Sequence, residues 1–181
     1  MGKLFVISDS SGVGKGTVIK EFLAQHPEFK LSISCTTRAP RVGEEDGVNY
    51  FFVSKSEFES LIKHNDFLEW AEFSGNFYGT KKSYIEKCIK EGKNIILEID
   101  TKGALKVKEL INEAKLIFIL PPSIEELESR LRGRHTESED AIQKRLSQIK
   151  LEMENSKHYD FQVINDSIEN AVKSLEKIMC N

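Results

Sequence analysis

A glycine-rich turn near the start of the chain has the residue types and spacing of a phosphate-binding loop. Residues 9–17 read Asp-Ser-Ser-Gly-Val-Gly-Lys-Gly-Thr and follow the apolar run 4–7. Glycines let backbone N–H groups converge on an anion, and the first turn of a helix adds positive potential. Lys15 would then reach the β- and γ-phosphates of a nucleotide. A glycine-rich turn with a solvated lysine is the alternative, but the order of strand, loop and helix favours the phosphate site.

A second segment, residues 34–52, carries groups suited to a phosphate monoester. Arg38 and Arg41 are close together in the chain, and their planar guanidinium groups can bind phosphate oxygens in pairs. Tyr50 and Tyr78 could add hydroxyl donors to the same phosphate. A polar surface loop with two exposed arginines is an equally good reading of the arginines alone, so they leave the question open.

Alternating strands and helices are expected to position these segments. Short β-rich apolar runs predict strands, and apolar residues at helical spacing predict helices between them. The expected strands cover residues 4–7, 31–34, 94–99, 116–120 and 161–164, and the expected helices cover 18–24, 81–91, 102–112, 137–156 and the stretches that begin at 123 and 167. This alternation predicts an α/β fold of the P-loop NTPase type, in which helices flank a parallel sheet.

The stretch from residue 34 to 80 breaks this alternation. A polar loop with arginines and glycines is followed by an expected strand at 50–53, a helix around 58–62 and an alternating strand at 67–73. We predict a small antiparallel lobe inserted into the main sheet.

Composition limits the partners and the location that can be expected. The chain has 181 residues and a net charge of -3, so no electrostatic argument favours a nucleic acid or a membrane surface. No apolar run is long enough to span a bilayer. The three cysteines, at 35, 88 and 180, lack metal-like spacing and the four histidines are scattered, so free thiols in a reducing compartment are expected and a metal cage is not. We expect a cytoplasmic protein that is a monomer or a weak homo-oligomer.

The segment 34–52 resembles the GMP-binding signature of guanylate kinases, S-x-T-T-R-x-P-R-x-G-E-x-x-G-x-x-Y-x-F, and fills every fixed position of it. The resemblance continues through Glu69, Asp100, the basic segment 130–134 and residues 159–166, so it spans almost the whole chain. It implies an enzyme that transfers the γ-phosphoryl group of ATP to GMP, and to dGMP, with Mg²⁺.

The resemblance also implies a role for each GMP-side residue. Phosphate would be bound by Arg38, Arg41, Tyr50 and Tyr78, with Glu44 in the same binding segment, and guanine by Ser34, Glu69, Thr80 and Asp100. Guanine presents the N1–H and N2–H₂ donors side by side, which one carboxylate can accept together. Adenine lacks that pair and would leave the carboxylate buried without a partner. Without the resemblance, Glu69 would be read as an ordinary solvated strand residue.

On the ATP side, the resemblance assigns catalysis to Lys15 and Arg38 together with Arg134 and Arg145 from a helical lid. ATP itself would be bound by Ser11, Gly12, Val13, Gly14, Lys15, Gly16, Thr17 and Asn165. Apart from the resemblance, the lid arginines fit a solvated helix face and Asn165 fits a turn. Glu98 and Asp100 could orient the waters of Mg²⁺.

Two positions of the phosphate loop depart from the pattern G-x-x-x-x-G-K-[ST]. Asp9 stands where the first Gly belongs, and Gly16 stands where the Mg²⁺-binding hydroxyl belongs. A carboxylate would repel the triphosphate unless its side chain points away or caps the neighbouring backbone. We therefore predict that ATP binding is weaker than the family norm.

The expected organisation is a single guanylate kinase-like domain over residues 1–181. Its core would comprise 1–33, 81–125 and 146–181, its GMP-binding lobe 34–80 and its lid 126–145. Two other classes stay open: a non-catalytic guanylate kinase-like module that binds partner peptides, and a nucleoside-monophosphate kinase with another base preference. Retention of Lys15, Arg38 and Arg41 argues against the first, and Glu69 with Asp100 argues against the second.

Overall fold

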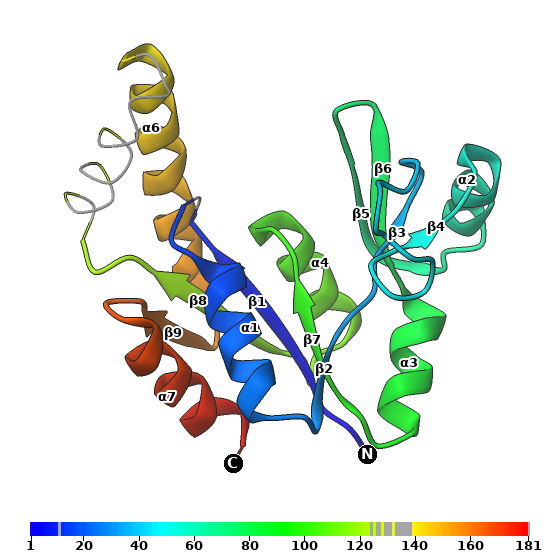
Figure 1. Cartoon of the computed structure of the whole chain (residues 1–181), viewed down its shortest axis with the longest axis horizontal. Coiled ribbons are helices and arrows are strands. Elements are labelled where there is room, and N and C mark those ends of the chain that lie inside the picture. The colour runs from blue at the N-terminus through cyan, green and yellow to red at the C-terminus, as the bar shows by residue number, and fades with distance from the viewer. Residues whose placement is uncertain (11, 124, 126–127, 129–131, 133–138, 181) are drawn as a thin grey trace. The chain divides into compact units, whose positions relative to one another are not determined.

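The computed structural model describes residues 1–10, 12–123, 125, 128, 132 and 139–180. The chain divides into two compact units. The first unit comprises Met1–Leu4, Glu28–Glu98 and Lys102–Ala114, and the second comprises Phe5–Pro27, Ile99–Thr101 and Lys115–Asn181. Figure 1 shows the helices and strands in chain order. The units are described separately below.

The main sheet has five strands in the order β2-β7-β1-β8-β9. In the second unit, β8 (Lys115–Leu120) pairs in parallel with both β1 (Leu4–Asp9) and β9 (Phe161–Ile164). In the first unit, β2 (Phe29–Leu31) pairs in parallel with β7 (Asn94–Glu98). The apolar runs of β1, β7 and β8 are almost completely buried, as expected for parallel strands covered on both faces. The predicted parallel sheet is confirmed.

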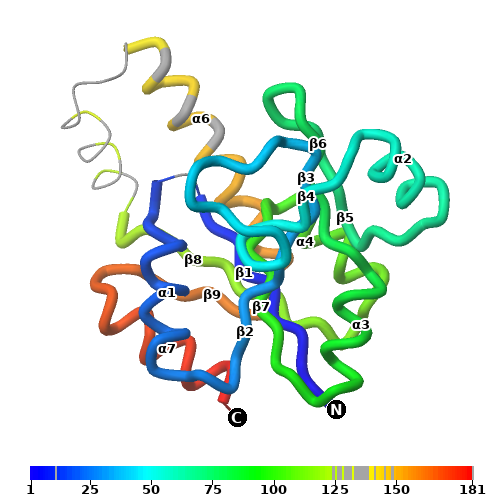
Figure 2. Tube along the Cα trace, turned by 45° about the vertical axis from the view of Figure 1, so that its right-hand side comes forward, coloured from blue at the N-terminus to red at the C-terminus, as the bar shows by residue number. Residues whose placement is uncertain are grey.

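Two helices of the second unit, α1 (Lys15–Gln25) and α7 (Ile168–Met179), pack against each other, and they lie side by side in both views (Figures 1 and 2). The Ser167 side chain caps α7 by accepting a hydrogen bond from the Asn170 N–H at 3.2 Å. The same unit contains α6 (Glu139–Asn155) and the short 3₁₀ helix Ser156–His158. Over the described residues, no helix combines the length and the apolar character needed to cross a membrane.

The predicted strand at 31–34 was wrong in its position. The observed strand β2 ends at Leu31, and the Ser32 N–H still donates to the Ile96 carbonyl at 2.8 Å. The side chain buried from β2 is Phe29, whereas Leu31 is exposed. The chain begins the next strand, β3 (Cys35–Thr36), only after residue 34.

The second sheet lies within the first unit and has the order β4-β3-β6-β5. The strand β6 (Asn76–Lys81) is antiparallel to both β3 and β5 (Phe67–Phe73), but β4 (Phe51–Phe52) is parallel to β3. The lobe is therefore a mixed sheet, not the wholly antiparallel one that was predicted. The difference arises because the long polar loop after β3 returns the chain to the end of the sheet at which β3 starts. The strand β4 therefore runs in the same direction as β3.

Helix α2 (Lys55–Lys63) closes the core of this lobe, and α3 (Lys82–Lys90) and α4 (Thr101–Leu110) follow later in the chain. Ser54 and Glu57 begin α2 with a capping box. From α2, the Phe58 ring stacks on Phe67 at 4.4 Å and on Phe77 at 5.4 Å between ring centroids. Burial also raises the pKa of the Cys35 thiol in this core to about 11, so that thiol stays protonated at neutral pH.

Gly79 on β6 has no room for a side chain beside β5. A Cβ at this position would lie 2.9 Å from Phe67 Cδ1, 2.9 Å from Trp70 Cβ and 3.0 Å from the Glu69 carbonyl oxygen. Those distances are too short for van der Waals contact, and the backbone oxygen cannot move without shifting β5. The absence of a side chain at Gly79 therefore fixes the spacing of β5 and β6.

We predict that Gly79→Ala lowers the free energy of unfolding by about 1–3 kcal/mol, the usual cost of overpacking. Urea unfolding followed by tryptophan fluorescence would measure the change, because Trp70 lies on β5. Lys90→Ala, at an exposed position of α3, is the control and should change the value little. An unaltered stability in Gly79→Ala would show that β5 and β6 can separate freely.

Candidate functional site

The predicted phosphate loop lies between the end of β1 at Asp9 and the start of α1 at Lys15. Gly12 and Gly14 have φ angles of 91° and 94°, a conformation that residues with a Cβ rarely adopt. Gly14 also caps α1, since its carbonyl accepts from the N–H groups of Thr17 at 3.1 Å and Val18 at 3.2 Å. Helix α1 therefore begins directly at the loop, so its N-terminus lies where an anion site requires it. Ser11 lies outside the described residues.

Asn165 holds this loop from the far end of the chain. It is buried, and its Nδ2 donates to the Val13 carbonyl at 2.7 Å while its backbone N–H donates to the Leu120 carbonyl at 2.8 Å. Asn165 thus ties the loop to the end of β8. No local sequence pattern predicts this contact, because the two residues are 152 positions apart. Its contact with adenine stays a prediction.

The Asp9 side chain turns toward the lysine of the loop. Its Oδ1 lies 2.9 Å from Lys15 Nζ, and the two side chains are only 17% and 14% exposed. An ion pair this sheltered from water is stronger than one on the open surface. The Asp9 side chain was expected to repel the triphosphate unless it pointed away or capped the neighbouring backbone. In the structure its carboxylate instead pairs with Lys15, the lysine that is expected to bind phosphate.

Carboxylates also lie near Tyr159 in the same unit. Burial, together with the negative charges of Asp100 and Asp9, raises the pKa of the Tyr159 hydroxyl to about 12, although the Ser8 hydroxyl lowers it. Asp100 and Asp9 therefore act on the same tyrosine. Asp100 is exposed and follows β7, whereas Glu98, also exposed, is the last residue of β7 and belongs to the first unit.

We predict that Asp9→Asn lowers the KM for ATP about 3- to 10-fold, because it frees Lys15 and removes a negative charge from the triphosphate. Asparagine keeps the size of the side chain, so the loop should stay folded. Initial rates at varied ATP would measure the effect, with Asp140→Asn on the exposed start of α6 as the control. If both Asp9→Asn and Asp9→Gly leave KM and kcat unchanged, Asp9 does not weaken ATP binding.

The second group of predicted residues gathers in the lobe of the first unit. The Arg38 guanidinium donates from Nη1 to Glu44 Oε2 and from Nη2 to Glu44 Oε1, both at 2.9 Å. The Arg41 backbone N–H donates to the same carboxylate at 2.7 Å, whereas the Arg41 residue is exposed. Arg38 Cζ also lies 5.4 Å from the centre of the Tyr50 ring, and the Tyr50 and Tyr78 rings meet edge to face at 6.2 Å.

Glu44 fixes the guanidinium plane of Arg38. The paired hydrogen bonds from Arg38, followed by the Arg41 N–H, hold the pKa of the Glu44 carboxyl below its usual value, and the same contact raises the pKa of Arg38. Both groups are thus charged at neutral pH. Sequence reasoning placed Glu44 in the binding segment but did not foresee this pairing.

Because the pKa of Glu44 is lowered on folding, its ion pair stabilises the protein above the unfolded carboxyl value, and that stability is lost as pH falls through the folded pKa. Wild type should therefore exceed Glu44→Gln by a constant free energy of unfolding from pH 8 to about pH 5, and the difference should shrink below about pH 4. Urea titrations at each pH would measure it. Glu45→Gln, at the exposed neighbouring carboxylate, is the control, and a difference independent of pH would contradict the pairing.

Two of the residues expected to bind guanine are partners across neighbouring strands. Glu69 on β5 lies opposite Thr80 on β6, and the buried Thr80 hydroxyl donates to Glu69 Oε1 at 2.6 Å. Ser34 lies in the same unit, where its carbonyl accepts the Phe51 N–H at 2.9 Å. Tyr78 and Thr80 are two residues apart on β6, so their side chains leave the same face of the sheet.

The predicted lid falls largely outside the described residues, and Arg134 is among those omitted. Arg145 lies on α6, but the structure does not describe its side chain. Arg132, a described basic residue of this stretch, pairs with Glu128 at 2.8 Å and with Glu139. Its hydrogen bonds lower the pKa of the Glu139 carboxyl to about 2.

A parallel sheet with a phosphate loop after its first strand defines a P-loop nucleotide-binding protein, and the lobe adds arginine, tyrosine and glutamate side chains for a second ligand. The family model described as guanylate kinase matches residues 1–181. A guanylate kinase of Clostridium perfringens strain 13 is 51% identical over 178 residues, which cover 98% of this chain and 82% of that protein. One from Synechocystis is 47% identical over 178 residues, covering 98% of this chain and 93% of that protein.

The solved structures agree. The crystal structure of guanylate kinase from Anaplasma phagocytophilum superposes with a TM-score of 0.73 at 32% identity, and the match covers 99% of this chain and 85% of that one. The chain belongs to the guanylate kinase family.

Proposed function

We propose that this chain transfers the γ-phosphoryl group of ATP to GMP, and also to dGMP, giving ADP and GDP for purine nucleotide metabolism. The supporting observation is the arrangement on β6. Tyr78, beside the Arg38 cluster, and Thr80, bonded to Glu69, leave one face of the sheet about 7 Å apart along the strand. A nucleotide with its phosphate beside Tyr78 and Arg38 and its base beside Thr80 and Glu69 would span this surface.

Base selection follows from the Glu69–Thr80 pair. The Thr80 hydroxyl binds one carboxylate oxygen and so fixes the orientation of the group. A fixed carboxylate can accept the N1–H and N2–H₂ donors of guanine together. Adenine offers no matching pair of donors and would bury the carboxylate unsatisfied, which costs about 1–3 kcal/mol or more.

Phosphoryl transfer between two phosphates needs positioning and charge neutralisation more than it needs a base. In this proposal Arg38, whose guanidinium group is oriented by Glu44, binds the GMP phosphate. Lys15 binds the ATP phosphates beside the N-terminus of α1. Lys15 must exchange the Asp9 carboxylate for a phosphate oxygen. Arg134 and Arg145 would add positive charge from the lid.

Mg²⁺ is the metal that this family implies, and the donor set fits it. Mg²⁺ prefers oxygen ligands and keeps several waters, which suits a helix start where Gly16 offers no hydroxyl. The carboxylates of Glu98 and Asp100 are exposed. When bound, the ion would neutralise charge on the ATP phosphates. Glu98 and Asp100 would orient its waters.

The proposed setting is the cytoplasm, where the chain would act on ATP and GMP as a monomer or weak homo-oligomer without a nucleic-acid partner. No disulfide joins the cysteines of the described chain, and two of them are buried, in accord with a reducing compartment. We further propose that residues 34–80 form the GMP-binding lobe, a range that lies entirely within the first unit.

The test is ADP release with Mg·ATP and GMP, AMP or UMP, on wild type and Glu69→Gln. GMP should be turned over far faster than AMP or UMP. Glu69→Gln should lower kcat/KM for GMP about 10- to 100-fold, because an amide cannot accept both guanine donors. The KM for ATP should stay the same.

The matched control is Glu72→Gln, which makes the same change at an exposed position of β5. Equal turnover of GMP and AMP would assign a different base preference. A folded protein that binds GMP without turnover would favour the non-catalytic binding module.

A further inference from the structure

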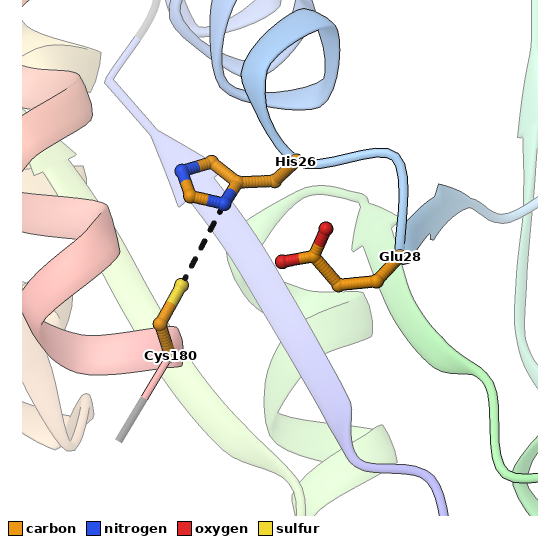
Figure 3. Close-up of side chains that lie close together, drawn as sticks. All are labelled: His26, Glu28 and Cys180. Atoms are coloured by element: carbon orange, nitrogen blue, oxygen red, sulfur yellow. Dashed lines mark hydrogen bonds between the residues drawn. The ribbon is translucent and has the colours of Figure 1, made fainter.

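The C-terminal ends of α1 and α7 bring together metal-binding side chains that the proposed reaction does not use. His26 Nδ1 lies 3.9 Å from Cys180 Sγ (Figure 3). Both helices belong to the second unit, as do His26 and Cys180. We propose that His26 and Cys180 bind a zinc ion.

Neighbours on both sides fix the orientation of the His26 ring. The ring stacks on Phe22 with centroids 4.5 Å apart, and its Nε2 lies 3.0 Å from Glu176 Oε1. With the ring proton assigned to Nε2, that proton is donated to Glu176 and the Nδ1 lone pair points toward Cys180. Metal-bound histidines usually donate their other nitrogen to a carboxylate in this way, which orients the ring and makes it a stronger ligand.

The distances suit a tetrahedral ion. Zn–S and Zn–N bonds of about 2.3 and 2.05 Å place the two ligand atoms about 3.6 Å apart in a tetrahedral site, close to the observed 3.9 Å. Thiolate and imidazole are ligands for zinc, whereas Mg²⁺ and Ca²⁺ prefer oxygen. Water would complete the coordination, since Cys180 is exposed.

The electrostatic surroundings also favour a cation. His26 is the C-cap of α1 and Cys180 is the C-cap of α7, so the negative ends of both helix dipoles meet here. Glu176 adds a carboxylate. In the metal-free state the Cys180 S–H and His26 Nδ1 lie at hydrogen-bond distance. When zinc binds, the thiol proton of Cys180 is released to solvent and an S–Zn bond replaces the S–H bond.

Such an ion would clamp the end of α7 to the end of α1. Its binding would stabilise the folded chain in proportion to the free zinc concentration. Its ligands lie outside the residues assigned to ATP and GMP, so the metal acts on stability and not on the proposed reaction.

The first test is a titration of the whole chain with Co²⁺ in excess Mg²⁺, followed by displacement with Zn²⁺. We expect one Co²⁺ per chain, tetrahedral d–d bands and a thiolate-to-cobalt charge-transfer band, and a rise in Tm with zinc. Cys180→Ser should abolish the charge-transfer band, and His26→Gln should weaken binding at least about 10-fold. Glu176→Gln should also weaken binding about 10-fold while it keeps the band.

His64→Gln is the matched control, because His64 is likewise a histidine at a helix C-cap, that of α2. It should bind metal as wild type does. Cys180 is exposed, so Cys180→Ser remains informative even if His26→Gln fails to fold. Binding that is unchanged in Cys180→Ser, or one metal shared by two chains, would overturn the proposed site.

Discussion

A cationic side chain that is positioned to bind phosphate needs a carboxylate partner while no phosphate is bound. Much of this structure follows from that constraint. A partly buried cation without an anion is costly. In the second unit Asp9 balances Lys15, and in the first unit Glu44 balances Arg38. Each pair holds its cation in a defined place. Under the proposed function, phosphate binding would therefore be an exchange of one anion for another, and its strength would depend on the difference between the two interaction energies.

The exchange requires a framework that stays fixed while the cation changes partner. In the second unit that framework consists of the left-handed glycines, the start of α1 and the Asn165 contact with the loop. In the first unit it is the close pairing of β5 and β6 at Gly79, which sets Glu69 opposite Thr80. Under the proposed function, recognition of base and phosphate would thus depend on backbone geometry.

The fold and the location of both binding segments could be predicted from sequence, because apolar periodicity and glycine spacing are local signals. Buried strands such as β8 and the capped start of α7 followed directly from them. The direction of β4 could not be predicted, since it depends on the path of a polar loop. Contacts such as Asn165 with Val13, or His26 with Cys180, join residues more than 150 positions apart and therefore leave no local signal in the sequence.

The most direct test of the exchange is a crystal structure of the chain with an ATP analogue and GMP bound. The quantity to measure is the distance from Lys15 Nζ to Asp9 Oδ1, which is 2.9 Å in the present structure. We predict that Nζ moves onto a phosphate oxygen and that its distance to the carboxylate exceeds about 4 Å, the limit of an ion pair. A lysine still paired with Asp9 while the triphosphate is bound would contradict the exchange.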